Sequence, residues 1–203
     1  MTGNETARVI NDFLGSAHVF ASAVTELIEE ELLREVAENQ ITVSQLRLLR
    51  LVDLVEAQTI GGVASYLGIS NAAASKAVDK LVRMMLLRRS EGETDRRAIH
   101  LSLTQPSRRI LAAYDSARER KLQQIFGAFE PGELEQATAL LDRLSSQIVG
   151  RGGEGKQICL QCGIYFRDKC VLQKLLDRPC RFQPQKGPGA ARTEEPPPRT
   201  AGD

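Results

Sequence analysis

The sequence predicts a mainly α-helical fold with a small β wing, and three observations support this prediction. Residues 59–104 follow the order helix, glycine turn, helix, strand, basic turn, strand. Long amphipathic helical patterns precede and follow this stretch. The 203 residues are 42% hydrophobic but only 4% aromatic, with no Trp, which is typical of a helical interior built from Leu and Ala. Together these features predict a winged helix-turn-helix flanked by long helices.

The N-terminal segment, residues 1–40, predicts one long amphipathic helix. Its apolar residues recur every three or four positions: Val9, Ile10, Phe13, Leu14, Ala17, Phe20, Ala21, Val24, Leu27, Ile28 and Leu32. A stripe of this length exceeds what a small domain needs, so the helix requires a partner. We therefore interpret residues 1–40 as a dimerisation helix, with a monomeric helical bundle as the alternative.

Residues 41–104 contain the predicted helix-turn-helix and its wing. Thr59 is placed to cap a short helix ending at Leu67, and Gly68 supplies the left-handed residue that terminates it. Ser70 then caps a second helix. One face of that second helix is an apolar stripe with spacing i, i+3, i+4 and i+7, formed by Ala74, Ala77, Val78 and Leu81.

The opposite face of the second helix has small polar and basic residues. Its candidate DNA contacts are Ser70, Asn71, Ala72, Ser75, Lys76 and Lys80. Small side chains let a helix backbone approach base edges in the major groove, and basic ones attract phosphates. This face favours binding to double-stranded DNA, although two helices joined by a glycine turn also occur in many proteins that bind no DNA.

A hairpin with a charged tip follows the second helix. Its second strand is indicated by apolar residues that alternate with polar ones, namely Ile99, Leu101 and Leu103 with His100 and Ser102. Arg96 and Arg97 lie at the tip, and a guanidinium is attracted to the narrow minor groove and its phosphates. A solvated turn is the alternative. The succession of helix and hairpin favours the DNA contact.

In this region the sequence resembles the MarR-type (multiple antibiotic resistance regulator) winged helix-turn-helix transcription regulators. The matching segments are residues 42–46 (TVSQL), 63–70 (VASYLGIS), 78–81 (VDKL) and above all 95–104 (DRRAIHLSLT). The resemblance covers about residues 8–149. One departure is visible, because the family usually has Gly soon after that last Thr, where this chain has residues 105–108 (QPSR). The departure concerns a helix start and not the face that would contact DNA.

The resemblance implies a homodimer, in which residues 1–40 interleave with C-terminal dimerisation helices in residues 105–149. The latter segment contains two helical stripes, made of Leu111, Tyr114, Leu122, Ile125 and Phe126, and of Leu134, Leu140, Leu141, Leu144 and Ile148. Pro131 suits the first position of the second of these helices. A two-fold dimer would place its paired helices on a palindromic promoter site, with half-sites about one helical turn apart.

The resemblance also implies a small aromatic or anionic effector that binds between the dimer helices and the winged domain. Phe13, His18, Arg47 and Arg50 would border that cleft. Because His18 shares an apolar helix face, we interpret it as a partnered core or interface histidine in preference to a ligand contact. An aromatic acid or its thioester is the expected chemistry, and control of aromatic-compound catabolism the expected setting.

The charges are segregated despite a net charge of only +1. Residues 76–100 contain seven Lys or Arg against four acids, whereas residues 26–38 contain six acids and one Arg. The basic footprint therefore coincides with the predicted DNA face. No apolar run reaches the roughly 18 residues of a membrane span, and no signal peptide is evident, so we expect a cytoplasmic protein without a membrane partner. No catalytic triad or phosphate loop is present, and we expect no enzyme activity.

The C-terminal segment departs from the usual pattern of the family. Residues 150–183 combine a Gly-rich linker with all four cysteines, Cys159, Cys162, Cys170 and Cys180, spaced C-x2-C-x7-C-x9-C. Because a cytosolic setting disfavours disulfides, we interpret them as one four-thiolate metal site, holding either zinc or a [4Fe–4S] cluster. A redox-sensing dithiol and free structural thiols are the alternatives. Residues 184–203 are rich in Pro and Gly and are expected to be disordered.

These expectations combine into one hypothesis about function. The chain is expected to be a DNA-binding transcriptional regulator, either a repressor or an activator, that responds to a small molecule, to a redox or metal signal, or to both. The alternative is a metal- or redox-sensing protein-interaction module without specific DNA binding.

Overall fold

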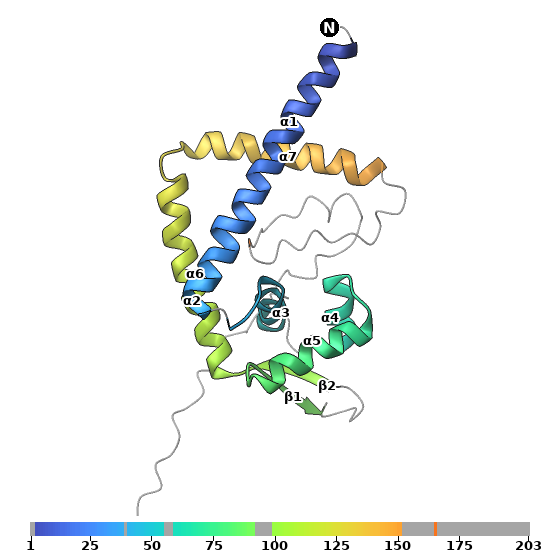
Figure 1. Ribbon diagram of the computed structural model, residues 1–203, viewed down its shortest axis with the longest axis vertical. Helices are drawn as coiled ribbons and strands as arrows, with labels where there is room; N and C mark the ends of the chain where they lie inside the picture. Colours follow the sequence, from blue (N-terminus) through green and yellow to red (C-terminus); the bar gives the residue numbers. More distant parts are fainter. Residues whose placement is uncertain (1–2, 39, 55–58, 92–98, 152–164, 166–203) are drawn as a thin grey trace, which may run out of the picture.

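The computed structural model describes residues 3–38, 40–54, 59–91, 99–151 and 165 (Figure 1). That part of the chain consists of helices and a single two-stranded antiparallel sheet. The long N-terminal helix and the two C-terminal helices form an extended frame, and a compact unit of three helices and the hairpin lies at one end of it. The predicted fold class, mainly α with a small β wing, is confirmed.

The N-terminal helix is built from three consecutive segments. These are α1 (Gly3–Ala23), the π-helical segment η1 (Val24–Glu30) and α2 (Glu31–Ala37). Backbone conformation stays right-handed helical across both junctions, so the segments form one continuous rod. The rod ends at Glu38, whose φ of 47° is left-handed. Such a residue terminates a helix because it turns the chain away from the helix axis.

The compact unit contains α3 (Val43–Leu54), α4 (Ile60–Leu67), α5 (Asn71–Arg83), β1 (Leu87–Glu91) and β2 (Ile99–Leu103). Leu87 pairs with Leu103 at the base of the hairpin. Its core is formed by side chains that are almost completely buried: Leu46, Leu49, Val63, Ala74, Val78, Leu81 and Leu87. Burying one Leu or Val of this kind contributes about 1.5–3 kcal/mol, so the unit holds its helices in fixed positions.

Local capping explains where α4 and α5 begin and end. The Thr59 hydroxyl oxygen accepts a hydrogen bond from the Gly62 N–H at 3.2 Å, and Ser70 does the same for the Ala73 N–H at 3.2 Å. Gly68 between the helices has φ 66°. A residue with a side chain is strained in that conformation, which is why the turn requires Gly. The helix starts and the glycine turn predicted from the sequence are confirmed.

Two C-terminal helices complete the frame, α6 (Gln105–Phe126) and α7 (Pro131–Arg151). Thr104 caps α6, and the following Pro stands in the first turn, where its missing N–H costs nothing. α7 starts at Pro131, as predicted. None of the helices in the described ranges is long and apolar enough to cross a membrane.

Candidate nucleic-acid interface

The buried stripe of α5 determines which of its side chains face outward. Ala74, Val78 and Leu81 are each 0% exposed. Because these residues are fixed in the core, the other side of the helix must face solvent. The predicted contact residues on that side are exposed at Ser70, Asn71, Ala72, Lys76 and Lys80 and half-buried at Ser75.

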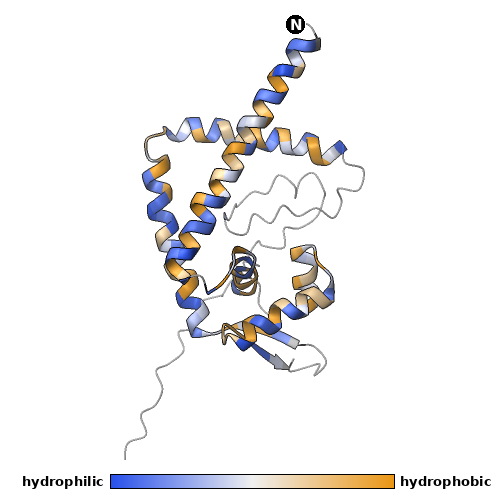
Figure 2. Ribbon diagram, in the orientation of Figure 1, coloured by the Kyte–Doolittle hydropathy of each residue, from blue (hydrophilic) through white to orange (hydrophobic). Residues whose placement is uncertain are grey.

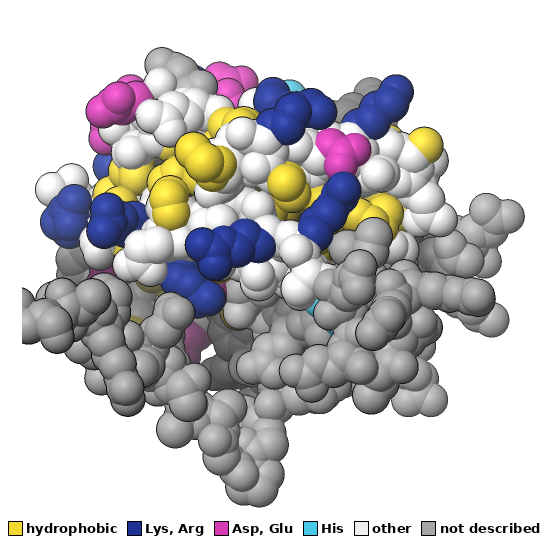
Figure 3. All heavy atoms as spheres, turned by 90° about the horizontal axis from the view of Figure 1, so that it is seen from below, with side chains coloured by type: hydrophobic (Ala, Val, Ile, Leu, Met, Phe, Trp, Pro, Cys, Tyr) yellow, Lys and Arg dark blue, Asp and Glu magenta, His cyan; other side chains and the backbone are white. Residues whose placement is uncertain are grey.

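Further cations extend this basic surface toward the wing. Arg83 at the end of α5 and Arg88 in β1 are exposed. Figure 3 views the molecule from the end where α5 and the hairpin lie, and more basic than acidic side chains appear on this face. Arg96 and Arg97, the predicted minor-groove residues, lie outside the described residues. The geometry thus joins the α5 candidates with two cations that the sequence analysis did not select.

An ion pair fixes the wing against α5. Arg89 Nη2 in β1 lies 2.6 Å from Asp79 Oδ1 in α5. Asp79 is the one acid in α5, and its pairing with Arg89 reduces the repulsion that it would exert on phosphate. His100 in β2 is half-buried, and its Nδ1 is buried without a hydrogen-bond partner among the described residues. His100 is therefore less solvated than its place on the polar face of the strand suggests.

Two arginines attach the compact unit to the frame. Arg47 Nη2 in α3 donates to Glu29 Oε2 in η1 at 3.0 Å, and the whole Glu29 residue is only 4% exposed. Arg50 in α3 forms a bidentate pair with Asp115 in α6, in which Nη1 to Oδ2 is 2.8 Å. Bidentate, charge-assisted pairs restrain orientation as well as distance. The attachment therefore connects the compact unit to the N-terminal rod and to α6.

A buried phenol lies beside these pairs. Tyr114 in α6 is 0% exposed, and its hydroxyl group has no hydrogen-bond partner among the described residues. Burial raises the pKa of the Tyr114 phenol to about 12, and the negative charge of Glu29 contributes to the shift. The phenol is thus held neutral next to a set of charged groups.

The proposed effector residues do not all meet in one described cavity. Arg47 and Arg50 do lie between the compact unit and the frame, each in an ion pair. Phe13 and His18 are exposed on α1. They precede the Glu29 attachment by at least eleven residues, roughly 16 Å along a helix. A single chain therefore does not bring these four residues together, and their grouping requires a second copy or another arrangement.

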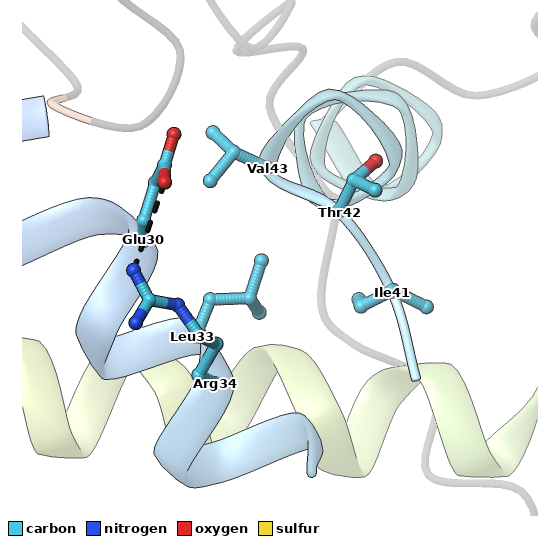
Figure 4. A pocket seen from close by; sticks show the side chains of 6 residues that line it. All are labelled: Glu30, Leu33, Arg34, Ile41, Thr42 and Val43. Atoms are coloured by element: carbon cyan, nitrogen blue, oxygen red, sulfur yellow. Dashed lines mark ion pairs between the residues drawn. The ribbon is translucent and has the colours of Figure 1, made fainter. Parts of the chain in front are cut away.

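A small cavity lies where the N-terminal rod meets α3 (Figure 4). It has a volume of about 280 Å³ and is lined by Glu30, Leu33, Arg34, Ile41, Thr42 and Val43. Glu30 and Arg34 form an ion pair of 3.7 Å at its edge, one helical turn apart. None of the four predicted effector residues lines this cavity. Its walls come instead from the connection around Ile41 between frame and compact unit.

The fold and the outward face of α5 define a class of protein, the winged-helix DNA-binding proteins. A MarR family profile matches residues 39–98, the range that contains α3, α4, α5 and β1. The transcriptional regulator AdcR of Streptococcus pneumoniae is 29% identical over 147 residues, which cover 71% of this chain and 98% of that protein. The chain therefore contains a MarR-family domain and is a DNA-binding transcriptional regulator of the MarR type.

Solved structures support the same conclusion at the level of the fold. The crystal structure of RV1404 from Mycobacterium tuberculosis has a TM-score of 0.59 and 26% identity, covering 70% of this chain and 94% of the other. FabT of Streptococcus pneumoniae, solved in complex with DNA, has a TM-score of 0.58 and 22% identity, covering 70% and 96%. The resemblance stated from the sequence is confirmed. Since the MarR family consists of transcription regulators, the expectation of a regulator and not an enzyme is confirmed as well.

The predicted metal ligands Cys159, Cys162, Cys170 and Cys180 lie outside the described residues. The metal site therefore stays a prediction. Glu29 and Asp115 were not selected from the sequence, and Tyr114 was named only as a member of an apolar helical stripe. Glu29 is one of six acids in a short run, and no spacing distinguishes it from its exposed neighbours.

Proposed function

We propose that this regulator binds a palindromic promoter site as a homodimer, with α5 in the major groove and the hairpin along the neighbouring backbone and minor groove. The observation that supports this most strongly is the orientation of α5. Its buried stripe aims Asn71, Ala72 and Lys76 away from the core, in a domain of a family that binds DNA. Base-edge contacts would come from the short side chains, and phosphate contacts from the basic ones.

The frame supports a dimer because its helices expose large apolar side chains. Val9, Ile10, Leu14 and Phe20 in α1 are at least half exposed, and Ile148 in α7 is 70% exposed. Figure 2 shows apolar residues along much of both helices. Soluble monomers rarely expose apolar surface in such continuous arrays, whereas a two-fold partner would cover it. A dimer also provides the two α5 helices that a palindromic site needs.

A small-molecule input is part of the proposal. An aromatic acid or its thioester bound where the frame meets the compact unit would alter the separation of the two α5 helices. Support comes from Arg47 and Arg50, which lie at this junction and could pair with an anion in place of Glu29 and Asp115. Because only a difference in affinity for two arrangements shifts their equilibrium, the change in DNA affinity must equal the change in ligand affinity. Control of aromatic-compound catabolism is the setting this chemistry fits.

Variants of α5 and of the wing test the DNA contacts. Lys80→Ala removes a proposed phosphate contact. It should lower the affinity for all DNA sequences alike and reduce the slope of log affinity against log salt concentration by about one unit. Replacing a base contact in Asn71→Ala should change which sequences are preferred. Arg97→Ala should cost about 1–3 kcal/mol of binding free energy if that guanidinium enters the minor groove. Binding is measured with duplexes of the chain's own promoter at several salt concentrations.

Arg120→Ala is the matched control, because Arg120 is an exposed cation on α6, in the frame. The control should bind as the wild type does. Equal losses in Lys80→Ala and Arg120→Ala would contradict the interface. A protein without any preference for its own promoter would favour the alternative of a metal- or redox-sensing interaction module.

A further inference from the structure

Tyr165 is the one described residue beyond α7, and it lies against the frame. Its side chain is half-buried and packs against the hydrophobic core. The Arg118 guanidinium of α6 lies over its ring, with Cζ 5.8 Å from the ring centroid. A guanidinium within about 6 Å of an aromatic face is attracted by the ring quadrupole. A residue of the C-terminal segment thus contacts the same helix that attaches to α3.

The surroundings of Tyr165 combine an acidic, a phenolic and a basic side chain. Glu29 and Tyr114, both buried, are its electrostatic neighbours together with Arg118. Burial raises the pKa of the Tyr165 phenol, and so do the charge of Glu29 and the proximity of its carboxylate to the hydroxyl. The Tyr165 hydroxyl has no hydrogen-bond partner among the described residues, and Glu29 therefore acts on it through its charge. The Tyr114 hydroxyl is likewise buried and unpartnered there.

Carboxylates at and beside this site also hold the compact unit in place. Glu29 accepts from Arg47, and Asp115 pairs with Arg50, so both carboxylates bind α3. Arg118, which stacks on Tyr165, lies 3.9 Å from the same Asp115 carboxylate. Tyr165 therefore neighbours the Glu29 carboxylate directly, and it is connected to the Asp115 carboxylate through Arg118.

We propose that Tyr165 is an intramolecular ligand of this site, formed by Glu29, Tyr114 and Arg118, and that its docking sets how the compact unit is held on the frame. Docking of Tyr165 thereby regulates DNA affinity through the frame. The effect on DNA affinity rests on the proposed DNA-binding function, whereas the docking of Tyr165 does not.

The sequence position of Tyr165 links this site to the cysteines. Tyr165 follows Cys162 by three residues and precedes Cys170 by five. A chain of three to five residues spans at most about 10–18 Å when fully extended. Any bond that restrains those thiolates therefore restrains Tyr165 as well. A metal or redox change at the cysteines would act on α3 through the occupancy of this site.

Docking can be measured directly because the chain contains only three tyrosines and no Trp. In full-length protein labelled with 3-fluorotyrosine, ¹⁹F spectra should show three signals, assigned by replacing each Tyr with Phe. The Tyr165 signal should titrate at a higher pH than free fluorotyrosine. The charge of Arg118 by itself lowers the pKa of the Tyr165 phenol, so Arg118→Gln would raise it further if the ring stayed docked. Because this variant should release the ring, we expect its titration to move toward that of free fluorotyrosine, whereas Arg120→Gln, two residues further along the same helix, should not change it. Titration of Tyr165 as a free phenol in the wild type would overturn the proposal.

The effect on DNA affinity is tested by the dissociation constant for promoter DNA. Tyr165→Ala should change it by about fivefold or more, the lower range of typical coupling between sites. Tyr165→Phe, which keeps the ring over Arg118, should change it less. Circular dichroism should show an unchanged fold in both. An unchanged constant in Tyr165→Ala would overturn the regulatory role. Wild-type protein that lacks DNA preference would overturn the proposed function, while the ¹⁹F titration would still decide docking.

Discussion

At the scale of single residues, Thr104 joins the wing to the frame with one hydroxyl group. Its Oγ1 donates to the Met85 carbonyl at 2.7 Å and accepts from the Ser107 N–H at 3.5 Å. The Thr104 N–H also donates to the Leu86 carbonyl at 3.3 Å. One residue therefore ties the turn before β1 to the start of α6.

Replacing Thr104 should reveal this double role. Thr104→Ala removes both the helix cap and the bond to Met85, and we expect a loss of about 1–3 kcal/mol in the free energy of unfolding. Thr59→Ala is the matched control, because Thr59 caps α4 at an exposed site and its hydroxyl has no second hydrogen-bond partner among the described residues. The control should lose about 1 kcal/mol or less. Urea unfolding measures both, and equal losses would contradict the junction.

Much of the compact unit could be predicted from individual residues, because its signals are local. Thr59, Gly68 and Ser70 act through their own backbone geometry, which the sequence encodes within four positions. The attachment could not be predicted in this way. Arg50 and Asp115 are 65 positions apart, and only the folded frame brings them together. The contact of Tyr165 with Arg118 is likewise a product of tertiary packing.

At the scale of elements, η1 explains how a carboxylate became buried in an amphipathic rod. The Glu31 N–H donates to the Glu26 carbonyl, five residues earlier, which is the π-helical pattern. Apolar periodicity predicted a long helix here, but it does not encode this local change of register. Because π-helical segments turn side chains away from the ordinary stripe, Glu29 can face Arg47 in α3. Segments of this kind are often found at functional sites.

The departure from the usual pattern of the family at the start of α6 has a simple structural consequence. The family's Gly is replaced, yet Thr104 still caps the helix and α6 begins at Gln105. Pro106 stands in the first turn, where backbone N–H groups have no intrahelical partner. The sequence analysis placed the departure at a helix start, and the structure accommodates it there.

The cysteine segment is the element whose chemistry can be tested without a structure. We expect Cys159, Cys162, Cys170 and Cys180 to hold one metal centre and the segment to become ordered when it is filled, because so short a segment cannot bury enough apolar surface of its own to offset its ordering entropy. Protein purified without oxygen should contain about one zinc per chain, or iron with sulfide and a visible absorption that bleaches in air.

Cys170→Ser should abolish either centre and leave the unfolding of the winged domain unchanged. Anaerobic protein that contains no metal and has four freely reactive thiols would contradict the site. In that case a redox dithiol or structural thiols would account for the cysteines.

At the scale of the whole molecule, the burial of apolar surface distinguishes the compact unit from the frame. The compact unit has its own core, whereas the outer parts of α1 and α7 leave large apolar side chains exposed. In a single chain, the compact unit therefore buries its own apolar core, whereas the frame leaves apolar surface that a second copy would cover. The sequence predicted this division from the length of the N-terminal stripe, but the pairing of two copies stays a prediction.

The most direct test of the account is the stoichiometry and specificity of binding to the chain's own promoter. Analytical ultracentrifugation of the free protein and of its complex with a palindromic duplex should show a dimer in both cases. The affinity should exceed that for random DNA of the same length by at least about 10³, and it should fall steeply with salt. A monomer in solution that binds one half-site alone, or equal affinity for promoter and random DNA, would contradict the account.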